Sequence, residues 1–163
     1  MRTAKKRRTT KESDIFVQID LDGNNTTEIS TGIGFFDHML NSFARHGFFD
    51  LTVKVKGDLE VDTHHTIEDT GIVLGQAIKQ AVGDKKGIVR YGSQILPMDE
   101  SLVLCALDLC GRPSLVYDLD LDREKVGDLE TEMVREFFYA VSYAAEMNLH
   151  IRQMAGMNNH HII

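Results

Sequence analysis

Residues 38–68 have the sequence HMLNSFARHGFFDLTVKVKGDLEVDTHHTIE, and the order of elements that this segment predicts occurs twice in the chain. The spacing of its apolar residues predicts a helix over 36–45, and Leu51 opens an alternating stretch that predicts a strand. A second, longer helix over 63–82 then begins at the pair His64-His65. His38, Leu51 and His64 follow one another at intervals of 13 residues.

The second half of the chain has the same order of elements. A helix over 132–146 carries Glu136, a strand-like stretch begins at Leu149, and the pair Asn158-Asn159 predicts the cap of a helix that begins at the pair His160-His161. Glu136 and Leu149 are again 13 residues apart, and the strand and the pair are 11 apart. This agreement indicates an internal duplication, with repeats of about 1–86 and 87–163 in one domain.

The remaining elements are predicted from alternation and turn residues. Residues 15–21 and 28–30 are expected to form an opening hairpin around the turn 22–25, and the basic run 5–8 a mobile N-terminal arm. Strands are expected over 87–97, 102–109 and 114–118. The charged stretch 120–130 is expected to be a surface loop.

The bulk composition limits the class of protein. A chain of 163 residues with 42% hydrophobic residues suits one globular domain. The net charge of -7 argues against nucleic-acid binding, and no apolar run is long enough to predict a membrane span or a signal peptide. Cys105 and Cys110 suit buried thiols in a reducing compartment, so we expect a cytoplasmic protein.

The chemistry is concentrated at the His-His pairs. One helical turn brings Glu68 close to both His64 and His65. Adjacent helical residues diverge by about 100°, so each pair is expected to serve two different metal ions. Imidazole with carboxylate suits Mn, Fe, Co, Ni or Zn.

Other polar residues are weaker candidates for the site. His38 lies at the start of the upstream helix, while the sequence leaves open whether His46 and His150 lie near the site, and neither is expected from its position to touch metal. Arg90 and Arg112 stand at strand ends, where each should face either a carboxylate or a phosphorylated ligand.

Three motifs resemble the imidazoleglycerol-phosphate dehydratase family of histidine biosynthesis. They are residues 31–40 (TGIGFFDHML), 64–69 (HHTIED) and 159–163 (NHHII), and the resemblance extends over the chain from Arg2. It implies an α+β fold of two similar repeats, each a four-stranded sheet with helices on one face, like the second domain of a small-subunit ribosomal protein. It also implies a homo-oligomer of twenty-four subunits built from trimers, with active sites between neighbours.

The resemblance further implies dehydration of imidazole glycerol phosphate to imidazole acetol phosphate, with two Mn²⁺ ions per active site. The expected metal ligands are His38, His64, His65, Glu68, Glu136, His160 and His161. Glu12, Arg90 and Arg112 match substrate-binding positions, and we also expect substrate contacts from His46 and from the ligands other than Glu136. Catalytic roles are expected for Glu12, His64, Glu68 and His161.

The sequence departs from the family pattern in two places. Glu136 stands where some members carry a further histidine, although a carboxylate also binds manganese. The family's second motif continues with a glutamate and a helix after Ile163, and that C-terminal helix is missing here. Either the polypeptide continues, or the second metal site of this chain is weakened.

The expected mechanism is dehydration through a metal-bound imidazolate, whose electrons expel the adjacent hydroxyl as water. Glu12 or a metal-bound water then moves the proton. Two alternatives remain open at this level. The same ligands suit a two-metal hydrolase of phosphate esters, and they also suit a non-catalytic protein in which metal clips subunits together.

Overall fold

Alternating burial along the strand β2 (Ser13–Asp20) shows which face of the first sheet packs on the core. In this strand, residues 13, 15, 17 and 19 are buried and the intervening ones are partly exposed, as expected where one face of a sheet packs on a core. The computed structural model describes residues 1–163, and β2 is a central strand of the sheet β1-β2-β4-β3. The other strands are β1 (Thr3–Thr9), β3 (Thr27–Ser30) and β4 (Asp50–Gly57).

The second sheet has the same topology. Its order is β5-β6-β10-β7, and β7 pairs in parallel with β10 as β3 does with β4. The strands are β5 (Tyr91–Met98), β6 (Ser101–Asp108), β7 (Ser114–Asp118) and β10 (Asn148–Ala155). The predicted α+β fold of two similar four-stranded repeats is therefore confirmed.

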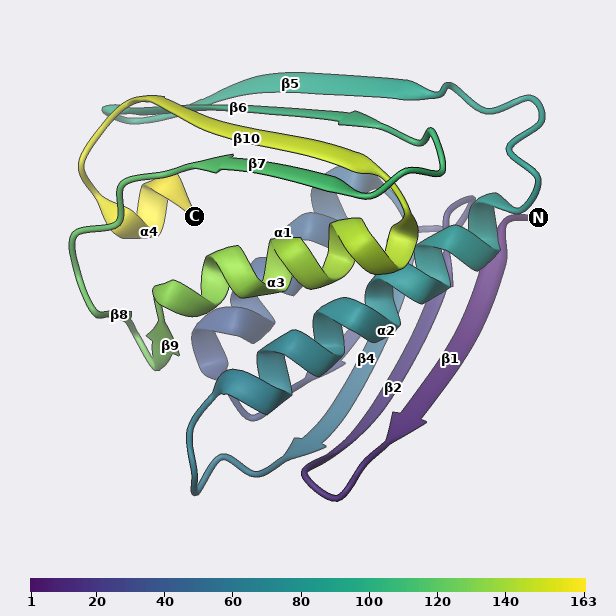
Figure 1. Cartoon of the computed structure of the whole chain (residues 1–163), viewed down its shortest axis with the longest axis horizontal. Coiled ribbons are helices and arrows are strands. Elements are labelled where there is room, and N and C mark those ends of the chain that lie inside the picture. Colours follow the sequence, from purple (N-terminus) through teal and green to yellow (C-terminus); the bar gives the residue numbers. More distant parts are fainter.

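The helices lie between the two sheets (Figure 1). In the first half these are α1 (Gly34–Gly47) and α2 (His64–Val82), and in the second α3 (Glu132–Ala145) and the short α4 (Asn159–Ile162). Helix α2 covers β1, β2 and β4 on one side and packs along α3 on the other. One continuous core of 25 buried residues draws on both halves, so the halves do not pack as separate domains. None of the helices has the length and apolarity needed to cross a bilayer.

Close packing of α2 on α3 depends on two glycines. A Cβ at Gly71 would lie 2.9 Å from Ala140 Cβ, and one at Gly75 would lie 2.6 Å from the carbonyl oxygen of Val141. Both distances are too short for a side chain. The glycines therefore set how closely the helices of the two halves approach each other.

Three sequence-based predictions of elements were wrong. The basic run 5–8 is part of β1, which pairs along its length with β2, so the N-terminal arm is an edge strand. The predicted opening hairpin does not form, because β2 pairs with β1 and β4 while β3 pairs in parallel with β4. The predicted loop 120–130 contains a small hairpin of β8 (Lys125–Val126) and β9 (Leu129–Glu130).

Candidate metal centre

The first His-His pair lies on the first turn of α2. His64 Nε2 is 3.0 Å from Glu68 Oε2, and the backbone N–H of His64 donates to Asp62 Oδ1 at 2.8 Å. The two imidazole rings have centroids 5.9 Å apart with planes at 80°. The rings therefore face different directions, as expected for adjacent residues on a helix.

His65 is oriented by a carboxylate from the loop that precedes the helix. Its Nδ1 lies 2.8 Å from Asp58 Oδ2. The hydrogen bond to Asp58 raises the pKa of His65, and the charges of Asp58, Glu12 and Asp62 act in the same direction against the opposing effect of desolvation. The turn that carries Glu12 lies against the start of α2, because the neighbouring Ser13 Oγ donates to the carboxylate of Asp69.

The second pair lies at the start of α4, and the predicted cap is confirmed. Asn158 Oδ1 accepts from the backbone N–H groups of His160 at 3.0 Å and His161 at 3.4 Å. The two rings are 6.0 Å apart at 84°, nearly the geometry of the first pair. The duplicated sequence motif therefore forms a duplicated local structure.

His161 is oriented by Glu100, from the turn between β5 and β6. Its Nδ1 lies 3.1 Å from Glu100 Oε2, and the other carboxylate oxygen accepts from the N–H of Asn158 at 2.9 Å. The pKa of Glu100 is lowered to about 2, and the largest cause is the hydrogen bond from the N–H of Asn158. Hydrogen bonds from His161, from the Glu100 backbone and from Ser101 act in the same direction. Glu100 is thus an ionised acceptor at neutral pH.

His38 joins the second pair. Its ring lies 5.8 Å from that of His160, and the ring of Phe35 packs edge-on against His160 at 5.1 Å. Asp128 holds the start of α1 in place, since its carboxylate accepts from the N–H groups of Gly34 at 2.7 Å and Phe35 at 2.9 Å. Asp128 belongs to the 120–130 segment, so this segment helps to position His38.

Two predicted site residues stand apart from these groups. His46 is exposed in the last turn of α1, eight residues from His38, a distance of roughly 12 Å along the helix. Glu136 on α3 has Arg135 as its ion-pair partner, at 3.3 Å. Neither residue contacts a histidine of the two pairs within this chain.

The two arginines meet at one corner of the second sheet. Arg90 forms a bidentate pair with Asp108, at 2.6 and 3.1 Å, and lies 5.0 Å over the ring of Tyr91. Arg90 lowers the pKa of Asp108, first through its hydrogen bonds and then through its charge. The charge of Arg112 lowers the pKa of Asp108 as well. Arg112 is exposed and forms no ion pair within the chain. The carboxylate partner expected for Arg90 is therefore present, while the charge of Arg112 is left free.

The arginine corner and the histidines lie at opposite ends of the sheet. Arg90 precedes β5 and Glu100 follows it, and a strand of eight residues spans roughly 26 Å. In Figure 1, β5 begins on the right, whereas α4 and the first turn of α2 lie on the left. One chain therefore does not bring the arginines to its own histidines.

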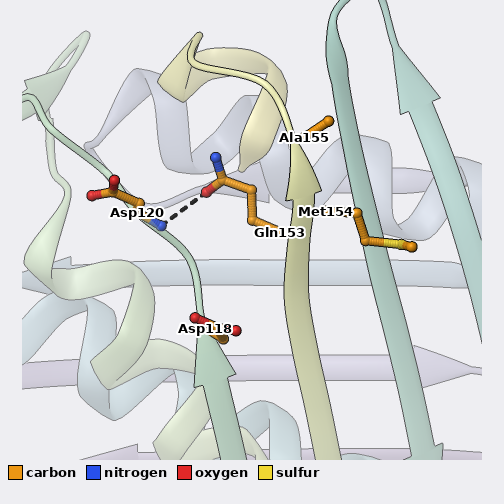
Figure 2. Close-up of a pocket in the computed structure, with 5 residues that line it drawn as sticks. All are labelled: Asp118, Asp120, Gln153, Met154 and Ala155. Atoms are coloured by element: carbon orange, nitrogen blue, oxygen red, sulfur yellow. Dashed lines mark hydrogen bonds between the residues drawn. The ribbon is translucent and has the colours of Figure 1, made fainter.

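Two surface hollows clarify where a ligand could bind. One, of about 220 Å³, lies between β7 and β10 and is lined by Asp118, Asp120, Gln153, Met154 and Ala155; the N–H of Asp120 donates to Gln153 Oε1 at 2.8 Å (Figure 2). It contains none of the predicted site residues, and its two carboxylates disfavour an anion. A second hollow, of about 210 Å³, is lined by Lys85, Ile88, Arg90, Leu109 and Cys110, which suits an anionic group.

Within one chain, the donor atoms supply only part of the ligand set that a transition metal needs. The 3.0 Å between His64 Nε2 and Glu68 Oε2 suits two adjacent ligands of one ion at metal–ligand distances of about 2.1 Å. However, no three His, Cys, Asp or Glu side chains of the chain converge on one point. The histidines thus form two incomplete ligand sets of the right chemistry.

Comparison with known proteins identifies the family. The family model described as imidazoleglycerol-phosphate dehydratase matches residues 31–163. The chain belongs to the imidazoleglycerol-phosphate dehydratase family. The match includes both His-His pairs, His38 and both arginines, and it confirms the resemblance inferred from the motifs.

Relatives and solved structures of this family agree. An imidazoleglycerol-phosphate dehydratase of Lachnoclostridium phytofermentans is 68% identical over 162 residues, 99% of this chain and 83% of that protein. That of Acetivibrio thermocellus is 63% identical over 96% of this chain and 80% of that protein. A crystal structure of the Staphylococcus aureus dehydratase superposes with a TM-score of 0.88 at 40% identity, covering 98% of this chain and 88% of that one.

Sequence reasoning missed the carboxylates that orient the histidines of this dehydratase-family chain. Asp58 and Glu100 contact His65 and His161, but neither was predicted as a site residue. A usable signal did exist for Glu100. The pair Glu100-Ser101 occupies the same place in the second repeat as Glu12-Ser13 in the first.

Proposed function

We propose that this protein removes water from imidazole glycerol phosphate to give imidazole acetol phosphate, a step of histidine biosynthesis. The observation that carries this proposal is the 68% identity, over 99% of the chain, to a protein named for this reaction. We place the reaction in the cytoplasm, because Cys105 and Cys110 are both free thiols.

We propose that two Mn²⁺ ions per active site are held by the two His-His pairs with His38, Glu68 and Glu136. The support is the chemistry of the donors, which are imidazoles and carboxylates without thiolate, and the diverging rings within each pair. When bound, the ions supply the acidity that favours loss of the imidazole N–H proton of the substrate.

The protein's own residues would carry the other steps. The hydroxyl beside the imidazole ring leaves as water, and a base must accept a proton from the next carbon of the glycerol chain. Glu12 suits this role, because its side chain is exposed and has no hydrogen-bond or ion-pair partner, while its charge reaches His65. The enol formed in this way rearranges to the ketone of the product.

The phosphate group is assigned to the arginine corner. Arg112 has no internal partner, and Arg90 lines a hollow together with Lys85. A guanidinium and an ammonium group suit a phosphate, and gripping this remote group would orient the reacting carbon atoms.

We further propose that each active site is completed between copies of the chain, in an assembly of twenty-four subunits built from trimers. Two observations support sharing between copies. The ligand sets are incomplete within one chain, and the arginine corner lies roughly 26 Å along β5 from the turn that holds His161. A small substrate does not span that distance, so a neighbouring copy must supply one of the two groups.

The test is product identity together with metal content. The purified protein, stripped of metal and refilled with Mn²⁺, should convert imidazole glycerol phosphate to imidazole acetol phosphate, without release of inorganic phosphate. His64→Ala should lower both turnover and bound Mn²⁺, whereas His150→Ala, on the exposed face of β10, should change neither. Release of inorganic phosphate would instead identify a hydrolase. Full assembly without turnover would identify a structural metal protein.

A further inference from the structure

The two repeats carry a glutamate at the same place. Glu12 ends the turn between β1 and β2, just before Ser13, the first residue of β2, and Glu100 ends the turn between β5 and β6, just before Ser101, the first residue of β6. Both serines are buried, Ser13 at 4% and Ser101 at 2% exposure, and the sheets share one strand order. Glu12 and Glu100 are therefore structural equivalents in the duplicated fold.

The equivalent glutamates have different surroundings. The Glu12 side chain has no hydrogen-bond or ion-pair partner in the chain. Glu100, in contrast, accepts from the N–H of Asn158 at 2.9 Å and from Ser101 Oγ at 2.9 Å, and its second oxygen faces His161 Nδ1 at 3.1 Å. One glutamate is free, and the other is fixed between its own turn and the start of α4.

The contact with Glu100 determines which nitrogen of His161 remains open. A carboxylate only accepts hydrogen bonds, so His161 Nδ1 must carry the hydrogen. In a neutral ring this leaves the Nε2 lone pair available to bind metal. Asp99 Oδ2 lies 3.8 Å from Nε2, beyond hydrogen-bonding distance.

The first repeat reaches the same result with a different residue. His65 Nδ1 lies 2.8 Å from Asp58 Oδ2, so Nδ1 again carries the hydrogen and Nε2 is open. Asp58 follows β4, whereas Glu100 follows β5, so the two carboxylates come from non-equivalent loops. Because Asp58 already orients His65, Glu12 is not needed for that purpose.

We infer that Glu100 is a positioning residue for the metal centre: it fixes His161 with Nε2 open and ties the second His-His pair to the β5–β6 turn. Asp58 does the same for His65, which leaves Glu12, the structural equivalent of Glu100, free to act on the substrate. The inference rests on the proposed function only in its assumption that His161 binds metal.

The substitution Glu100→Gln tests the direction of the hydrogen bond. The amide oxygen can still accept from Asn158, but the amide NH₂ then donates to His161 Nδ1, which moves the hydrogen to Nε2 and blocks metal binding. We expect Mn²⁺ affinity to fall about 10- to 100-fold. Glu28→Gln, an exposed glutamate on β3, is the matched control and should keep full affinity.

The tautomer itself is a readout that a purely structural role would not move. In metal-free protein with ¹⁵N-labelled histidine at pH 8, the NMR signals absent from His161→Ala identify the His161 ring. These signals should report Nδ1–H in the wild type and Nε2–H in Glu100→Gln. An Nε2–H tautomer in the wild type would overturn the inference, even if the variant did not fold.

Metal binding separates failure of this inference from failure of the proposed function. If the wild type binds no Mn²⁺, the proposal of a metal centre is wrong. The NMR measurement of the His161 tautomer still tests whether Glu100 orients His161. If the wild type binds Mn²⁺ and Glu100→Gln binds it equally well, Glu100 is not a positioning residue.

Discussion

His64 Nε2 lies 3.0 Å from Glu68 Oε2, one helical turn apart on the first turn of α2. The side chains are about half exposed, 46% and 42%, so the contact is accessible from solvent and is not a buried structural pair. An exposed pair of this kind contributes little to stability. Its geometry is consistent with the metal-binding role proposed for both side chains.

We expect Glu68→Gln to lower Mn²⁺ affinity at least about tenfold, because an amide is a weaker ligand than a carboxylate. The free energy of unfolding of the metal-free protein should hardly change, since the exposed pair adds little to it. Metal content per subunit and urea unfolding measure the two quantities. Glu60→Gln, an exposed residue outside the helix, is the control. Equal metal content in wild type and Glu68→Gln would remove Glu68 from the ligand set.

We expect Arg112→Ala to raise KM for imidazole glycerol phosphate by about 10- to 100-fold, because a charge-assisted hydrogen bond contributes about 1.5–3 kcal/mol. Folding should be unaffected, since Arg112 has no ion-pair partner within the chain. Steady-state kinetics measures the effect. Arg2→Ala, which breaks an exposed pair with Asp22, should leave KM unchanged. An unchanged KM in Arg112→Ala would contradict the assignment of the phosphate.

We expect Gly75→Ala to lower the free energy of unfolding by about 1–3 kcal/mol, the usual cost of overpacking. The added methyl group would lie 2.6 Å from the Val141 carbonyl oxygen and 2.8 Å from Ala144 Cβ, which forces α2 and α3 apart. Urea denaturation measures the change. Gln76→Ala, the exposed neighbour on α2, should be nearly neutral. A fully stable Gly75→Ala would mean that the two helices can separate without cost.

We expect the stability contribution of Asp22 to depend on pH. Hydrogen bonds from the Arg2 side chain and backbone lower the pKa of Asp22 from 3.8 to about 2. A carboxyl with a lowered folded-state pKa stabilises the protein above its unfolded pKa, and this contribution is lost as the pH falls from about 4 to 2. Asp22→Asn should therefore unfold at a lower temperature than wild type at pH 7, with the difference vanishing near pH 2. Arg2→Ala should show the same pH profile. A difference that persists at pH 2 would exclude the ion pair as its cause.

Much of the fold was predictable because the helices of each repeat have recognisable local patterns of apolar and capping residues. Apolar spacing predicted α1, α2 and α3, and Asn158 predicted the cap of α4. The pairing of the strands was harder to predict from the sequence. β1 contains four consecutive basic residues, 5–8, and only one buried residue, Ala4, so no alternating pattern in the sequence predicted its pairing with β2.

The two similar halves, each with a His-His pair at the start of a helix, could be predicted from the sequence, since helical periodicity and capping act over a few neighbouring residues. The partners of these pairs became known only from the folded chain. Glu100 reaches His161 across 61 residues, and His38 meets His160 because two helices from different halves begin near each other. Such contacts depend on strand register and on the packing of α2 against α3, which no local pattern specifies. The separation of Arg90 from the histidines is likewise set by the direction of β5, because the arginine precedes this strand and the turn that holds His161 follows it.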